Sequence, residues 1–174
     1  MIADLALLGC VCVVLWIAAS DMLHRRIPNV LCLLCLLFAG LFAYLSGGWP
    51  VLASGALHGL LALVVGMALF SLKFVGGGDA KFYAAIAVAV PLGSALPMLG
   101  WTSVSGFILL VAMIAWRRLA MREKGVAGSV LLPYGVAIAS GFLILTVTGW
   151  GARPQDGNRS GQDIMRALPK GVNF

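Results

Sequence analysis

Two aspartates lie at the edges of apolar stretches in a chain that carries only six acidic residues. Asp21 belongs to the sequence S-D-M-L-H-R-R-I-P-N at residues 20–29, and Asp79 belongs to G-G-G-D-A-K at residues 76–81. Acids beside membrane spans are costly and tend to be functional. Two close carboxylates can hydrolyse a peptide bond without a metal, because the ionised one takes a proton from water while the protonated one donates to the scissile carbonyl. The pair therefore suggests an aspartic peptidase that works at a membrane surface.

A structural role is open for each aspartate taken alone. Asp21 could pair with Arg25 one helical turn later, and Asp79 could cap the helix that follows it or pair with Lys81. The pair is more informative than either residue, because both are expected at one membrane face. The other acids are expected elsewhere, on the opposite face, in a basic loop or in the tail: Asp4, Glu123, Asp156 and Asp163.

Three glycines, Gly76, Gly77 and Gly78, precede Asp79 directly. A protease that cuts near a membrane helix must bind its substrate extended, and glycines without side chains allow a close backbone approach. A plain turn at the start of a helix is the alternative. A phosphate-binding loop is disfavoured, because no strand precedes the glycines and no G-K-[ST] sequence follows them.

The composition identifies the class of protein to which these residues belong. The 174 residues are 61% hydrophobic and 10% charged, and the mean hydropathy is +1.03, whereas soluble domains average about a quarter charged residues. We predict an all-α integral membrane protein, a bundle of about six transmembrane helices. The predicted spans are residues 5–20, 30–46, 51–72, a short one starting near 79, 98–116 and 130–150, with Pro91, Gly93, Pro97 and Gly100 breaking the long uncharged stretch after residue 82.

One membrane domain, residues 1–152, is expected, followed by a polar C-terminal tail at residues 153–174. Lysines and arginines cluster in the loops after spans one, three and five, and such loops are usually cytoplasmic. Asp21 and Asp79 are then expected on the cytoplasmic side. The four basic residues of the tail fall on the opposite side, which is disfavoured.

Cysteines and histidines give no metal site by their spacing. Cys32 and Cys35 form a C-x-x-C pair, but no second ligand pair is spaced to complete a zinc site. We therefore interpret the four cysteines as small packing residues, and His58 as a core histidine with a satisfied hydrogen bond. No metal and no cofactor is predicted.

The two aspartate motifs, in this order and with six spans, resemble the type IV prepilin peptidases, which belong to the Gly-x-Gly-Asp aspartic membrane proteases. The resemblance covers residues 1–150. It implies that Asp21 and Asp79 are the catalytic pair. It also implies that the residues of the two motifs lie at the substrate: Arg25, Arg26, Pro28, Asn29, Gly76, Gly77, Gly78 and Lys81.

The resemblance further implies a substrate and a cell compartment. The substrate is a prepilin with a basic leader and a hydrophobic N-terminal helix, cut after a glycine at the cytoplasmic face of a bacterial inner membrane. The four-cysteine zinc domain of long members has no counterpart here, so the chain resembles the short branch that serves Flp pili of tight-adherence systems, and methylation of the new N-terminus is not expected. The pilus assembly machinery is a possible further partner, and nucleic acid is not expected.

Two other classes of function remain open. A small proton- or cation-coupled transporter could use the same two acids, although transport sites usually lie near mid-membrane between repeated halves. A non-enzymatic pilus assembly protein would tolerate the loss of both carboxylates.

Overall fold

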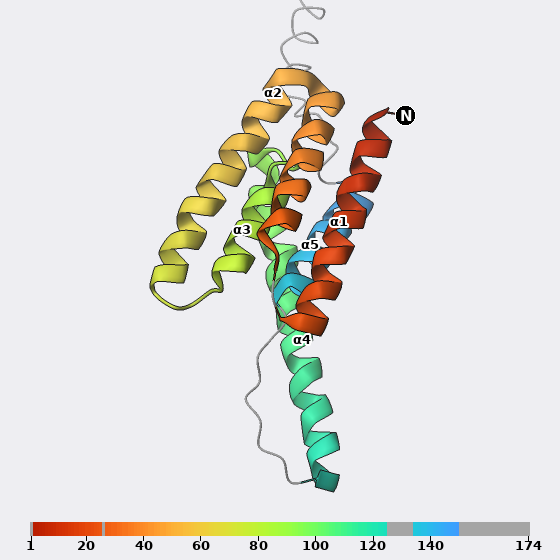
Figure 1. The fold of residues 1–174 in the computed structure, drawn as a ribbon, viewed down its shortest axis with the longest axis vertical. Coiled ribbons are helices and arrows are strands. Elements are labelled where there is room, and N and C mark those ends of the chain that lie inside the picture. Colours follow the sequence, from red (N-terminus) through yellow and green to blue (C-terminus); the bar gives the residue numbers. More distant parts are fainter. Residues whose placement is uncertain (1, 26, 125–133, 150–174) are drawn as a thin grey trace, which may run out of the picture.

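The protein is described here from a computed structural model, which covers residues 2–25, 27–124 and 134–149. The elements in chain order are α1 (Ile2–His24), α2 (Asn29–Ser71), α3 (Gly77–Ala87), η1 (Leu92–Ser94), α4 (Ala95–Lys124) and α5 (Tyr134–Val147). These residues contain no strand, so the all-α prediction is confirmed (Figure 1).

Helix α2 consists of two arms that run side by side in opposite directions (Figure 1). The turn lies at Gly47 and Gly48, whose backbone angles are not helical. Gly48 has φ +67° and ψ −157°, a region that is open to glycine and strained for other residues. The rings of Tyr44 and Trp49 pack edge-on across the turn, with centroids 5.8 Å apart. The sequence prediction of two separate helices at 30–46 and 51–72 therefore matches the two arms.

The predicted number of six membrane spans is not confirmed. By length and composition, three stretches among the described residues can cross a membrane, namely Ile2–His24, Asn29–Ser71 and Leu92–Trp116. Helix α3 has 11 residues and α5 has 14, both below the roughly 20 that a full crossing needs. The predicted tail at 153–174 and the start of the sixth span lie outside the described residues.

The break between the fourth and fifth predicted helices is shorter than the sequence suggested. Helix α3 ends at Ala87, and Pro91 precedes the single 3₁₀ turn η1. Pro97 and Gly100, which were expected to belong to the break, lie inside α4. Proline is tolerated there because the first turn of a helix has no intrahelical acceptor for its amide groups.

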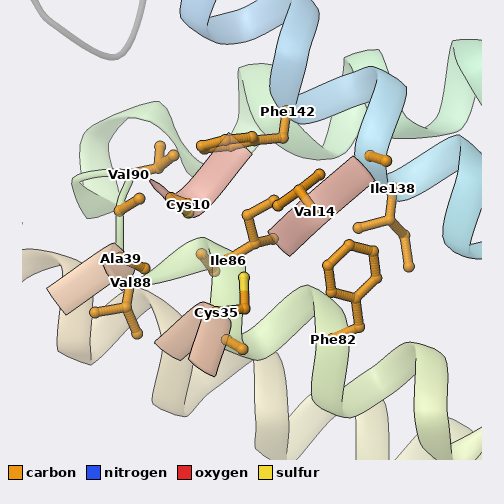
Figure 2. Close-up of a cluster of buried hydrophobic side chains, with 14 of the residues drawn as sticks. Cys10, Val14, Cys35, Ala39, Phe82, Ile86, Val88, Val90, Ile138 and Phe142 are labelled. Carbon is orange, nitrogen blue, oxygen red and sulfur yellow. The ribbon is translucent and has the colours of Figure 1, made fainter. Parts of the chain in front are cut away.

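Side chains from α1, α2, α3 and α5 meet in one core (Figure 2). Phe82 and Ile86 of α3 are fully buried there, with Phe142 of α5 packed in the same cluster. Three of the cysteines are buried packing residues, as predicted, whereas Cys12 is exposed. The outer helix faces carry many exposed leucines and valines, which suits a lipid environment.

Glycines bring the second arm of α2 and α3 into close contact. A methyl group added to Gly59 would lie 2.8 Å from the carbonyl oxygen of Ala84, and one added to Gly66 would lie 2.9 Å from the side chain of Ala80. A methyl group added to Gly55 would likewise overlap the backbone carbonyl group of Val88. Small residues at such contacts are typical of membrane helix pairs, because they let the backbones approach. This contact fixes the position of α3, the helix that carries Asp79.

Candidate active site

Asp21 lies in the last turns of α1 and is buried. Its Oδ2 atom accepts a hydrogen bond from the backbone N–H of Gly135, at 2.8 Å. Gly135 is in the first turn of α5, where backbone N–H groups have no intrahelical partner. The N-terminal end of α5 therefore faces the Asp21 carboxyl group, which is an arrangement that stabilises a negative charge.

Asp79 lies in the first turn of α3, which is not one of the three long membrane-spanning stretches. Gly76 is the N-cap residue, with an extended backbone. Burial and, to a lesser extent, the neighbouring charge of Asp21 raise the pKa of the Asp79 carboxyl to about 6, although a hydrogen bond with the Gly76 backbone acts in the opposite direction. Asp79 therefore keeps its proton at a pH where an ordinary aspartate is ionised.

Residues close to each aspartate in the chain belong to the same buried core. Ile17 precedes Asp21 by one helical turn, and Phe82 follows Asp79 by three residues, and both side chains are fully buried in the same cluster. The charge of Asp21 contributes to the raised pKa of Asp79, so the two carboxyl groups are within electrostatic range of each other. Acid–base hydrolysis of a peptide bond uses two carboxyl groups, and α1 and α3 each supply one.

The three glycines before Asp79 are packed closely and carry no unusual backbone angle. A methyl group on Gly76 would lie 2.6 Å from Oδ2 of Asp79, and one on Gly78 would lie 3.3 Å from Cβ of Ile27. Gly77 faces the ring of Phe70 at 3.2 Å on the same measure. None of the three has a positive φ. Their absence of side chains therefore leaves room for the Asp79 carboxylate and for the chain that follows α1.

The other described residues that the sequence placed near a substrate lie at the end of α1 and at the starts of α2 and α3. Arg25 follows the end of α1 in a left-handed conformation, with φ +53°, and its backbone N–H bonds to the carbonyl oxygen of Asp21 at 2.9 Å. Pro28 is the N-cap residue of α2. Lys81 donates from Nζ to Oδ1 of Asn29 at 3.3 Å. Arg26 lies outside the described residues.

The sequence analysis missed Gly135. A methyl group on this residue would lie 2.8 Å from Oδ2 of Asp21 and 3.1 Å from its Cβ and Cγ atoms. The only local signal is a proline at position 133, near the start of the sixth predicted span, which is typical of a helix start. The contact joins residues 114 positions apart, so no local pattern could reveal it.

No group of three or more potential metal ligands occurs among the described residues. His58 is buried in the second arm of α2, and its Nδ1 lies 3.0 Å from the carbonyl oxygen of Val90. The prediction of a satisfied core histidine is confirmed.

Comparison with known proteins identifies the family. A sequence model of the type IV leader peptidase family matches residues 8–114, a range that includes both aspartates and all of α3. The chain belongs to the type IV leader peptidase family. This leader peptidase is accordingly a membrane-embedded peptidase of an aspartic-type family, with a prepilin as substrate. No curated protein and no solved structure matches the chain.

Proposed function

We propose that Asp21 and Asp79 are the catalytic pair of this leader peptidase. The observation that carries the proposal is that Asp79 is close enough to Asp21 for the charge of Asp21 to contribute to the raised pKa of Asp79. Both carboxyl groups have a backbone partner, Gly135 for Asp21 and Gly76 for Asp79, and Asp79 is the one whose pKa rises to about 6. Asp79 is then the member that holds the proton.

The reaction follows from this division of roles. The Asp21 carboxylate takes a proton from the attacking water, and the Asp79 carboxyl donates its proton to the oxygen of the scissile carbonyl, which gives a neutral tetrahedral intermediate. The intermediate breaks down when the proton held by Asp21 passes to the departing amine. Asp79 recovers its own proton from the hydroxyl group as the new carboxylic acid forms.

We further propose the basic leader of an Flp-type prepilin as the substrate, cut after a glycine at the cytoplasmic face of a bacterial inner membrane. The support is the ordered pair of aspartate motifs together with the basic residues in the loops on the same side of the predicted topology. Endopeptidase activity alone, without methyl transfer, is the activity that these residues support. A transporter is disfavoured because both acids lie at helix ends, Asp21 near the end of α1 and Asp79 at the start of α3.

The test is prepilin cleavage by Asp21→Asn and Asp79→Asn variants reconstituted in lipid vesicles. Asparagine keeps the size of the side chain but cannot pass on a proton. Each variant should accumulate in the membrane and lose cleavage by at least about three orders of magnitude, which is the scale on which acid–base groups act together. Cleavage by either variant at near the wild-type rate would refute the catalytic assignment.

A further inference from the structure

An open groove of about 550 Å³ lies on the side of α3 that faces the two arms of α2. Each of three helical segments contributes four lining residues at positions i, i+3, i+4 and i+7, within residues 29–36, 56–63 and 81–88. Such a pattern places two full helical turns along each wall. With a rise of 1.5 Å per residue, the groove is about 10 Å long.

The groove is polar at one end and apolar along the rest of its length. Asn29 and Lys81 lie at the polar end, and every other lining residue is alanine, glycine, valine, leucine or cysteine. The direction of the second arm of α2 agrees with this polarity, since Gly66 lies against Ala80 near the polar end and Gly55 lies against Val88 at the apolar end. A ligand that fits must therefore combine a polar head with an apolar chain.

The charge at the polar end is positive. Lys81 uses one of its three ammonium hydrogens in the bond to Asn29, whose Oδ1 atom accepts it. The remaining ammonium hydrogens and the amide NH₂ group of Asn29 are donors, so the complementary head group is an anion. Lys81 is exposed, so its head reaches solvent or a membrane head group.

The groove does not lead directly to the candidate catalytic pair. Asp79 and Lys81 are two residues apart on α3, so their side chains point about 160° apart around the helix axis. The groove borders the buried core through Cys32, Ala85 and Val88, but neither Asp21 nor Asp79 is among the residues that line it. A molecule in the groove would contact α3 without touching the carboxylates, which favours a lipid over the scissile segment of the substrate.

We propose that this groove binds an anionic phospholipid, with its phosphate at Lys81 and Asn29 and one acyl chain along the apolar walls. The inference goes beyond the peptidase activity and does not depend on the roles of the two aspartates. Because α3 carries both Asp79 and the groove wall, the lipid would also stabilise the helix that positions Asp79.

The test measures lipids that copurify with the full chain. Wild-type protein and variants are solubilised from vesicles of equimolar phosphatidylcholine and phosphatidylglycerol, and the retained lipids are quantified by mass spectrometry. The attraction of one lysine for an anionic membrane lipid corresponds to about a fivefold preference. We expect about that enrichment of phosphatidylglycerol on the wild type, and its loss in Lys81→Gln.

Matched controls distinguish lipid binding in the groove from general attraction of lipid to the protein surface. Lys73→Gln removes the same charge outside the groove, and it should keep the enrichment. Ala56→Phe fills the apolar end of the groove, so it should retain less of either lipid, whereas Ala53→Phe adds the same ring to an exposed site on the same arm and should behave as the wild type. Thermal unfolding of each variant shows that it is folded.

Three results would overturn the proposal. One is equal enrichment in the wild type and in Lys81→Gln. Another is an equal loss in Lys73→Gln and Lys81→Gln, which would indicate general surface attraction. The third is displacement of phosphatidylglycerol by an excess of prepilin, which would assign the groove to the substrate. Loss of cleavage in the aspartate variants affects none of these measurements, so the two proposals fail independently.

Discussion

Replacement of Gly135 by alanine should damage catalysis while leaving the fold in place. The added methyl group would lie 2.8 Å from Oδ2 of Asp21 and 3.1 Å from Cγ. Ordinary contacts between carbon atoms are about 3.5–4.0 Å. The carboxylate must therefore rotate, or α5 must move away from α1 by several tenths of an ångström, and either change lengthens the 2.8 Å hydrogen bond between Gly135 and Asp21.

The expected loss follows from the value of this hydrogen bond. A hydrogen bond to a charged group contributes about 1.5–3 kcal/mol, which corresponds to about a 10- to 150-fold change in rate if the bond is needed in the transition state. Displacement of a catalytic group by about 1 Å has a similar cost, on the order of 100-fold. We therefore expect kcat/KM for prepilin cleavage to fall about 100-fold in Gly135→Ala.

The assay is prepilin cleavage in vesicles, with thermal unfolding measured on the same preparations. Gly106→Ala is the matched control, because its added methyl group would lie 3.5 Å from Cβ of Ala137, an ordinary contact at the interface of α4 with α5. The control should cleave at the wild-type rate. If Gly135→Ala also cleaves within about twofold of the wild type, which is under 0.5 kcal/mol, then Gly135 does not position Asp21.

Three further predictions concern the pH dependence, the packing of α3 and the membrane topology. Because the pKa of Asp79 is raised to about 6 and the reaction needs its proton, cleavage should decline as the pH rises through about 6; a rate that climbs steadily into the alkaline range would contradict this role. Gly55→Ala would overlap the backbone that follows α3 and should destabilise the protein by about 1–3 kcal/mol, whereas Gly40→Ala, with its nearest neighbour at 3.9 Å, should leave the melting temperature unchanged; equal melting temperatures would refute the close contact. In a cysteine-free background, a cysteine in place of Arg118 should react with a membrane-impermeant reagent only after permeabilisation, whereas one in place of Gly48 should react in intact cells, and the reverse pattern would place the aspartates on the outer side.

The sequence was sufficient for the class of fold and for the family. Lipid leaves backbone groups unsatisfied, so long apolar stretches without alternation have to be helical, and the described residues are helical as predicted. The scarcity of acids made Asp21 and Asp79 conspicuous, and their motifs agree with the family match over residues 8–114. The turn at residues 47–48 was also readable, because adjacent glycines and a following proline interrupt the apolar stretch.

The number of membrane spans and the exact position of the break before α4 could not be predicted from the sequence. An apolar stretch contains no signal that marks where one helix ends and the next begins. Pro97 was therefore assigned to the break, although it lies in the first turn of α4. Length alone also leaves α3 and α5 below the size of a full crossing. Sequence patterns therefore predicted helical elements better than they predicted how far each element extends.

Only the tertiary structure decided what surrounds each carboxylate. The hydrogen bond from Gly135 to Asp21 joins α5 to α1, and the contact of Gly59 with Ala84 places α3 against α2. These contacts depend on packing between segments far apart in the chain. Sequence determines which groups can ionise, whereas burial and neighbouring donors decide which of them keeps its proton, because a pKa responds to the local surroundings of the group and not to its position in the chain.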